Sequence, residues 1–295
     1  MKSNNIILVP IDFSPKSMLA FEQAKYLAKI SESDIMLLNI LQLDSKSFSF
    51  IHSIFSDTEK DVMRQRIETG IREKLNKLID DNKSSEIDIK SMVLTGKVYE
   101  QIIEVSKSLN CNYIVMGVND SDMDKQNQIL GTNASRIVRM SEIPVLTVNN
   151  TVMKDLKTLI LPLDLTKETQ QKVAKAIKVA RMTNAKIRIV TALLTDEPDV
   201  VDKLHRQMGF VEKFIYENYG NVSADFVFGN KDKDTLSGLV MKYAQEKNGD
   251  LIVVMTQQEN NWLKLFVGTT AMDIIYNSPI PVLSVVPKDI NSLKF

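Results

Sequence analysis

The sequence contains one cysteine, two histidines, no long apolar run and no excess of charge of either sign. The single cysteine, Cys111, excludes a disulfide within the chain. It stands beside a predicted buried strand, where a free cysteine is more often a small core residue than a nucleophile. The apolar run at the N-terminus ends at Asp12, too soon for a signal peptide, and no stretch approaches the roughly 20 apolar residues of a membrane span. These absences predict a cytoplasmic protein without a membrane-spanning segment.

The charge balance and the missing motifs argue against several classes of function. Lysine and arginine together number 37, as do aspartate and glutamate, so the basic surplus typical of nucleic-acid-binding proteins is absent. His52 and His205 are not part of a metal-ligand motif, and we interpret both as solvated or interface histidines. The sequence has no Walker A motif, no H-E-x-x-H motif and no nucleophile-base-acid set. We therefore predict that the protein is not an enzyme.

The first half alternates short apolar strands with amphipathic helices. A strand at residues 6–11 ends before Asp12, Ser14 is a good N-cap, and Pro15 suits the first position of a helix. Further strands are predicted at residues 35–41, 87–94, 113–116 and 145–148, with helices at about 57–81 and 98–109 and after Gly131. The helix at 57–81 is predicted to bury one apolar stripe, which consists of Val62, Ile67, Ile71, Leu75 and Leu78.

The same series restarts after residue 150. Residues 159–163 and Asp164 repeat residues 8–11 and Asp12, and Gly229 matches Gly96. A second Gly-Thr pair, Gly268-Thr269, matches Gly131-Thr132, and the sequence I-P-V-L occurs at residues 143–146 and again at 280–283. One domain is therefore predicted to be duplicated, with domains at residues 1–150 and 151–295.

Alternating strands and helices with short connections predict an α/β fold, with parallel sheets covered by helices on both faces. In such doubly wound sheets, ligands lie beyond the carboxyl ends of the strands, where the winding direction reverses. The first half is predicted to form a crevice there from Asp12, Gly117, Gly131 and Thr132, and the second half from Asp164, Met255, Gly268 and Thr269. Each Gly-Thr pair opens a helix, whose N-terminal N–H groups favour a phosphate.

Three stretches of the first half resemble the universal stress protein family: V-P-I-D-F-S at residues 9–14, N-Y-I-V-M-G at 112–117, and Gly131-Thr132 followed by I-P-V-L. D-L-I-V-V at 250–254 and the second Gly-Thr and P-V-L resemble it as closely, so the likeness extends over both halves. This resemblance implies two tandem five-stranded sheets of strand order 3-2-1-4-5, in a Rossmann-like fold of the adenine nucleotide alpha hydrolase type. It also implies two domains that pair through their last strands.

Some members of that family bind ATP through an aspartate after the first strand and a motif Gly-x2-Gly-x9-Gly-(Ser/Thr). By similarity, Asp12, Ile40 and Met116 would line an adenosine pocket, and Gly117, Gly131 and Thr132 would hold phosphates. Both halves depart from the motif. In the first, Asp120 replaces the second glycine, where a carboxylate would repel phosphate unless it held Mg²⁺. In the second, Met255 and Gln258 replace two glycines and only Gly268-Thr269 is kept.

Several alternatives stay open at this point. Asp12 and Asp164 either contact a nucleoside or cap a helix, and each Gly-Thr pair either binds phosphate or makes a tight turn. The apolar connections at residues 48–55 and 262–266 either cover the core or bind a partner. The first hypothesis is a non-enzymatic cytoplasmic stress-response protein with degenerate nucleotide-binding motifs, and the second is an ATP/Mg binder and slow ATPase. A third is a structural dimerisation module, for which a homodimer is compatible with the sequence. The protein partner is not identifiable from the sequence.

Overall fold

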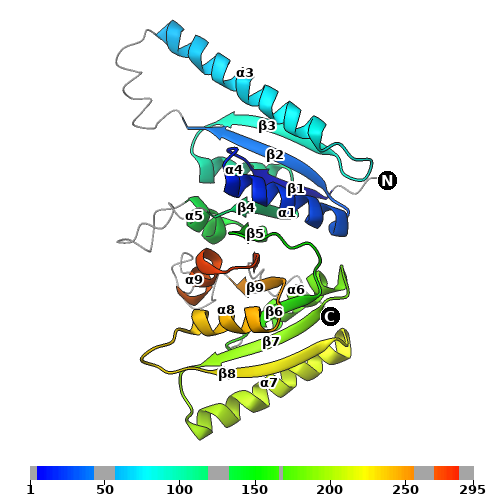
Figure 1. Ribbon diagram of the computed structural model, residues 1–295, viewed down its shortest axis with the longest axis vertical. Coiled ribbons are helices and arrows are strands. Elements are labelled where there is room, and N and C mark those ends of the chain that lie inside the picture. The colour runs from blue at the N-terminus through cyan, green and yellow to red at the C-terminus, as the bar shows by residue number, and fades with distance from the viewer. Residues whose placement is uncertain (1–4, 43–56, 119–132, 166–168, 256–268, 286–295) are drawn as a thin grey trace. The chain divides into compact units, whose positions relative to one another are not determined.

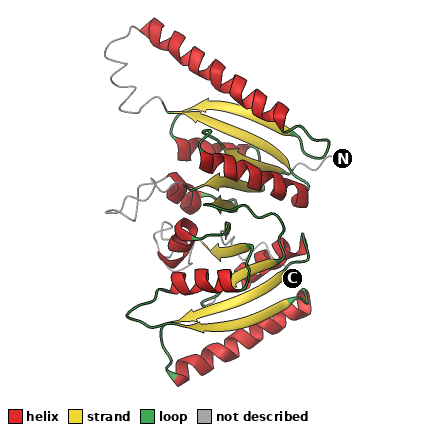
Figure 2. Cartoon of the chain, viewed as in Figure 1, coloured by secondary structure: helices red, strands yellow, loops and turns green. Residues whose placement is uncertain are grey.

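The structure is a computed structural model that describes residues 5–42, 57–118, 133–165, 169–255 and 269–285 (Figure 1). The chain divides into two compact units, Met1–Ile137 and Val138–Phe295. Each unit consists of strands that alternate with helices (Figure 2). The predicted α/β class is therefore confirmed.

The N-terminal unit has a parallel sheet with the strand order β3-β2-β1-β4. This order matches the first four strands of the predicted 3-2-1-4-5 arrangement. A further helix, α5 (Asn133–Met140), begins in this unit. The preceding elements are β1 (Ile6–Pro10), α1 (Pro15–Ser31), β2 (Asp34–Leu41), α3 (Asp57–Asp81), β3 (Ile89–Thr95), α4 (Val98–Ser108) and β4 (Tyr113–Gly117).

The C-terminal unit has the strand order β5-β10-β9-β6-β7-β8. All neighbours in this sheet are parallel except β5 and β10, which are antiparallel. The strands of the second repeat are β6 to β10, and their order in the sheet is β8-β7-β6-β9-β10. Numbered within the repeat, this is the predicted order 3-2-1-4-5, so the prediction is confirmed. The elements are β5 (Val145–Val148), β6 (Thr158–Pro162), α6 (Thr169–Arg181), β7 (Lys186–Leu193), α7 (Pro198–Asn218), β8 (Val222–Phe228), α8 (Leu236–Glu246), β9 (Leu251–Met255), α9 (Thr269–Asn277) and β10 (Val282–Val285).

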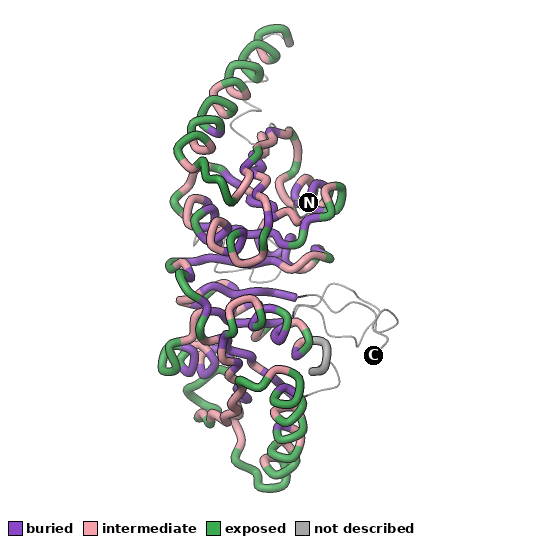
Figure 3. The backbone as a smooth tube through the Cα atoms, turned by 90° about the vertical axis from the view of Figure 1, so that its right-hand side faces the viewer, coloured by how far each residue is buried: buried purple, intermediate pink, exposed green. Residues whose placement is uncertain are grey.

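The helices cover both faces of each sheet. In the N-terminal unit α1 contacts β1, β2 and β4, α3 contacts β2 and β3, and α4 contacts β2. In the C-terminal unit α6 contacts α7, and α8 contacts α9. Right-handed crossovers place α1 and α3 on one face and α4 on the other, because the winding reverses after β3; the same argument separates α6 and α7 from α8 and α9. The central strands are buried along their length (Figure 3), as expected of a parallel sheet.

The helix α3 has the predicted bounds but not the predicted buried face. Leu75 is fully buried, whereas Val62 is 45% exposed, so the prediction that Val62 faces inward is wrong. The reason is one of length. A helix of 25 residues is about 37 Å long, whereas the neighbouring β3 has 7 residues and extends over only about 23 Å. The N-terminal part of α3 therefore continues past the sheet (Figure 1) and has no strand to cover.

The last strand of the first repeat, β5, is held in the C-terminal unit by side chains as well as by its backbone. The amide nitrogen of Asn149, a buried residue, lies 3.1 Å from the carbonyl oxygens of Ile275 and Tyr276 and 3.0 Å from that of Ser278. It thus donates hydrogen bonds at the C-terminus of α9, where helix carbonyls lack partners within the helix. On β10, the Ser284 hydroxyl donates to the Val145 carbonyl at 3.0 Å. This is the pairing of last strands that the family resemblance implies.

Candidate functional site

The turn between β1 and α1 begins the candidate site of the N-terminal unit. Phe13 has a φ of 64°, a left-handed conformation that is uncommon for a bulky residue. Ser14 is the N-cap of α1, since its hydroxyl accepts a hydrogen bond from the Ser17 N–H at 3.2 Å, and Pro15 occupies the first turn, as predicted. On the strand side, the amide of Asn39 donates to the Ile11 carbonyl at 2.6 Å. These bonds hold the unfavourable conformation in place.

Asp12 lies at this turn with its carboxylate directed to its own helix. Its Oδ1 accepts a hydrogen bond from the Ser14 N–H at 2.9 Å, and its N–H donates to the Ser17 hydroxyl at 3.3 Å. Burial acts to raise the pKa of Asp12, but the hydrogen bonds with Ser14 and Ser17 outweigh burial and lower that pKa below its ordinary value. The carboxylate is therefore ionised at neutral pH, and it stabilises the turn that leads into α1.

The predicted crevice belongs where the winding of the sheet reverses, between β1 and β4. These strands pair at Ile7 with Tyr113 and at Leu8 with Ile114, and both strands continue beyond that register to Pro10 and Gly117. Such a switch point, outside the carboxyl ends of the strands, is where doubly wound sheets bind ligands.

The structure brings three of the predicted adenosine-pocket residues to this same edge. Ile40 lies near the end of β2 and is half-buried, Met116 lies near the end of β4 and is buried, and Asp12 follows β1 between them. The strands β2, β1 and β4 are adjacent and parallel, so the residues at or after their carboxyl ends lie at the same edge of the sheet. Their contact with a ligand stays a prediction.

Gly117 has a structural reason to be glycine. A Cβ atom at this position would lie 2.5 Å from the carbonyl oxygen of Lys16 and 2.6 Å from its carbonyl carbon, so no side chain fits. The first turn of α1 thus packs directly on the end of β4. This close approach accounts for Gly117 without any phosphate, so the glycine alone is not evidence for a phosphate site.

The C-terminal unit builds the same turn after its first strand. Leu165 has a φ of 58°, which corresponds to the left-handed Phe13. The hydroxyl of Thr191 donates to the Leu163 carbonyl at 2.9 Å, as the Asn39 amide does in the other unit. Asp164 is exposed at the position of Asp12, and Thr269 is exposed at the start of α9. The scaffold of the crevice is therefore repeated.

Lys172 distinguishes this second crevice from the first. When the repeats are aligned without a gap, Lys172 stands where the N-terminal unit has Ala20, which is fully buried. Its ammonium group donates a hydrogen bond to the Pro162 carbonyl at 3.1 Å, at the carboxyl end of β6. Met255 replaces Gly117 at the end of β9 and is buried. This contact of Lys172 was not predicted from the sequence, because it depends on how α6 packs against β6.

Several predicted residues lie outside the described part of the chain. They include the Gly-Thr residues Gly131, Thr132 and Gly268, the substituted positions Asp120 and Gln258, His52, and the apolar connections at residues 48–55 and 262–266. His205 is described; it lies on α7, is exposed, and its ring centroid is 4.2 Å from that of Phe226. Among the described residues, no group of three or more histidine, cysteine, aspartate or glutamate side chains is placed to hold a metal ion.

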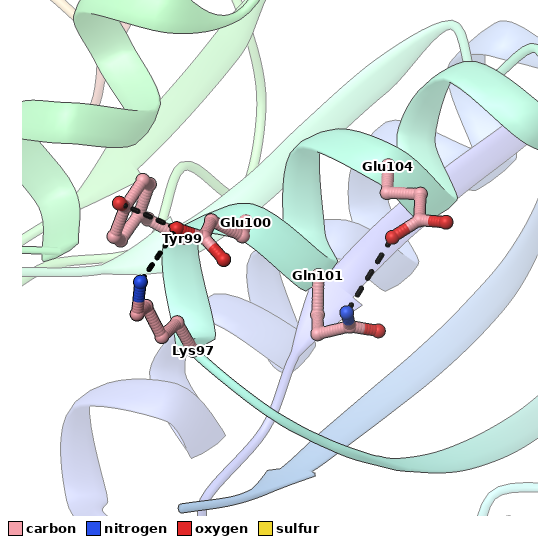
Figure 4. Close-up of polar contacts among 5 residues, drawn as sticks. All are labelled: Lys97, Tyr99, Glu100, Gln101 and Glu104. Carbon is pink, nitrogen blue, oxygen red and sulfur yellow. Dashed lines mark hydrogen bonds and ion pairs between the residues drawn. The ribbon is translucent and has the colours of Figure 1, made fainter.

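A polar cluster at the start of α4 was not predicted from the sequence (Figure 4). Glu100 accepts hydrogen bonds from the Tyr99 hydroxyl at 2.8 Å and from the Lys97 ammonium at 3.2 Å. The guanidinium of Arg136, on α5, lies 4.8 Å from the centre of the Tyr99 ring. The hydrogen bond from Tyr99 and then the one from Lys97 lower the pKa of Glu100. Glu100 is exposed, so the cluster lies at the surface, and the contact of Arg136 with Tyr99 connects α4 to α5. No helix in the described residues is both long and apolar enough to span a membrane.

Comparison with known proteins gives consistent matches for both halves. Residues 3–149 and 156–286 each match the model of the universal stress protein family. Universal stress protein G of Shigella flexneri is 26% identical over 144 residues, which are 48% of this chain and 96% of that protein, and the protein of the same name from Escherichia coli O157:H7 matches equally.

Solved structures resemble the whole chain. A universal stress protein from Archaeoglobus fulgidus DSM 4304 has a TM-score of 0.73 at 19% identity, with 97% of this chain and 98% of that chain covered. A protein of unknown function from Pseudomonas aeruginosa PAO1 has a TM-score of 0.64 at 16% identity, with 97% and 94% covered. At such identities these structures show that the fold is shared.

Proposed function

Because this chain belongs to the universal stress protein family, with two family domains in tandem, we propose that it acts in the stress response by binding and not by catalysing a reaction. The observation that supports this most directly is the state of Asp12. A general base works best with a pKa near the operating pH, whereas Asp12 has a lowered pKa and accepts a hydrogen bond from its own turn. We also propose that the domains are residues 1–150 and 151–295; a cytoplasmic location stays a prediction.

A second candidate function is the binding of an adenine nucleotide by the N-terminal crevice. It is favoured by the position of Asp12, Ile40 and Met116 at one edge of the sheet, on either side of the switch point. In the C-terminal unit, Lys172 stands where the N-terminal unit has Ala20, and its ammonium group lies at the carboxyl end of β6, where it donates to the Pro162 carbonyl. We therefore assign the nucleotide to the N-terminal unit alone. Mg²⁺ would depend on Asp120, which lies outside the described residues.

Thermal unfolding with and without ATP and Mg²⁺ tests the second candidate. A nucleotide at a hundred times its dissociation constant adds about 2.7 kcal/mol to the free energy of unfolding and raises the melting temperature. Asp12→Ala is expected to abolish the shift, and the matched Asp164→Ala is expected to leave it unchanged. The absence of a shift at millimolar ATP would exclude nucleotide binding and leave the binding of other ligands or of proteins.

The first proposal has a separate test. The purified protein is incubated with ATP and Mg²⁺, and phosphate release is followed with the wild type and with Asp12→Ala. The proposal predicts equal release at the level of the buffer control. Hydrolysis by the wild type that disappears in Asp12→Ala would show that the protein is an enzyme.

A further inference from the structure

One face of α7 is apolar and uncovered. The inner face of this helix contacts β8 and buries Met208 and Ile215. The outer face presents Phe210, which is 75% exposed, and Phe214, which is 43% exposed. The two rings are one helical turn apart and therefore share a face. In the N-terminal unit, α3 occupies the corresponding place in the fold, and its exposed large apolar residues are Val62 and Met63, without an aromatic ring among them.

The residue beside Phe210 is a glycine that the fold does not require. Gly209 is exposed in the middle of α7, and a Cβ atom there would meet nothing within 4 Å. Glycine within a helix is unfavourable relative to alanine, because it costs conformational entropy. The open space at Gly209 leaves room for the close approach of another helix.

The charges around Phe210 are arranged so that this face complements itself. Lys203 precedes Phe210 by about two helical turns, and Glu217 follows it by about two turns, so both lie on the same face. Arg206 and Phe214 lie about one turn away on opposite sides. In an antiparallel pair of α7 helices related by a two-fold axis at Phe210, Lys203 of one helix lies opposite Glu217 of the other. Arg206 of one helix likewise lies opposite the Phe214 ring of the other, which is a cation–π arrangement.

We propose that the outer face of α7 binds α7 of a second copy of this chain, antiparallel, with the two-fold axis at Phe210. Such an interface uses the same patch on both copies, as two-fold dimers require. Each dimer then contains two Lys203–Glu217 pairs between copies. Within its own helix Glu217 lies 3.8 Å from Lys213, so the pair becomes part of a small charge network. The mixed signs favour a second copy over an anionic membrane surface, which would select a purely basic face.

Sedimentation equilibrium of the full chain over micromolar to millimolar concentration tests the proposal. The wild type is expected to form a reversible dimer. Lys203→Glu or Glu217→Lys alone places two like-charge pairs in each dimer and is expected to raise its dissociation constant about tenfold or more. The double variant Lys203→Glu/Glu217→Lys restores opposite charges and the wild-type dissociation constant. Phe210→Ala, an exposed position whose change leaves the fold intact, is expected to give a monomer.

Lys77→Glu on the exposed face of α3 is the matched control and leaves the dimer unchanged. A wild type that stays monomeric at every concentration overturns the proposal, whether or not it binds anionic vesicles. A dimer that is insensitive to the two single charge changes uses another surface and also overturns it. Failure of the double variant to recover excludes the antiparallel register.

Discussion

The first strands of the two repeats are arranged alike, but the chemistry at corresponding positions differs. Leu8 pairs with Met36 and Ile114, and its counterpart Ile160 pairs with Arg188 and Ile252, which aligns the two sheets residue by residue. By this alignment three positions that are apolar in the N-terminal unit are polar in the C-terminal unit. They are Met36, Met92 and Val105 on one side and Arg188, Asp225 and Tyr243 on the other.

The polar set forms a hydrogen-bonded group under α8. The Tyr243 hydroxyl donates to the Asp225 carboxylate, and the Arg188 guanidinium donates to the Ser223 hydroxyl at 3.3 Å. Burial, the hydrogen bond to Asp225 and the charge of Asp225 raise the pKa of Tyr243, while Arg188 acts in the opposite direction. The Nε atom of Arg188 is buried and has no hydrogen-bond partner among the described residues. The layer between sheet and helix is therefore filled by apolar side chains in one repeat and by a hydrogen-bonded polar group in the other.

The largest expected effect comes from exchanging a residue between the crevices. Gly117→Met introduces the residue found at Met255, but its Cβ atom would lie 2.5 Å from the Lys16 carbonyl oxygen. We expect a loss near the upper end of the about 1–3 kcal/mol that overpacking costs. Urea unfolding measures it. Gly70→Ala on α3, where a Cβ atom meets nothing within 4 Å, is the control and should stabilise by about 0.5–1 kcal/mol. Equal stability of Gly117→Met and wild type would show that α1 can shift away from β4.

Breaking the polar group should cost less. Tyr243→Phe removes the donor to Asp225 and leaves a carboxylate with a lost partner, which costs about 1–3 kcal/mol. The effect has a pH window, because the raised pKa of Tyr243 means that its hydroxyl contributes stability below the unfolded pKa of about 10, and the contribution is lost as the pH rises further. Urea unfolding of both proteins at pH 7 and above pH 10 measures this, and the two curves should converge at high pH.

The whole polar group can also be replaced by its apolar counterparts. The triple variant Arg188→Met/Asp225→Met/Tyr243→Val copies the N-terminal unit. Tyr243 is buried and Arg188 and Asp225 are half-buried, and inward-facing charged groups replaced together by apolar residues often leave stability unchanged or raise it by about 1–4 kcal/mol. We therefore expect the triple variant to be at least as stable as the wild type in urea unfolding. A triple variant less stable than Tyr243→Phe would mean that the polar group is needed by the C-terminal unit.

The smallest effect is expected at the turn that both units share. Asp12→Ala removes the acceptor for the Ser14 N–H and should cost about 1 kcal/mol at pH 7. Because the pKa of Asp12 is lowered in the folded state, its contribution is present above the unfolded pKa of about 3.9 and is lost as the pH falls through the folded value. Wild type and variant should therefore converge in urea unfolding once the pH lies below the folded pKa of Asp12. A constant difference down to that pH would mean that the carboxylate is not the cause.

The sequence was sufficient for features that depend on neighbouring residues. The N-cap Ser14, the helix start at Pro15 and the bounds of α3 follow from local patterns and are confirmed. The exposure of Val62 could not be predicted, because it depends on how far the sheet extends beneath α3. The direction of the Asp12 carboxylate and the reach of Lys172 likewise depend on backbone geometry at the end of a strand.

The pairing of β5 with β10 has a consequence for how the chain is made. β5 leaves the ribosome long before β10. The backbone N–H and C=O groups with which β5 pairs to β10 therefore stay unpaired until the last strand of the second repeat is made. An uncovered edge strand is a template for pairing with other chains. Either repeat expressed alone would carry such a bare edge and is expected to self-associate through it. In the duplicated chain, β10 covers the edge of β5 within the same molecule, and the covalent link keeps the two strands at a high local concentration.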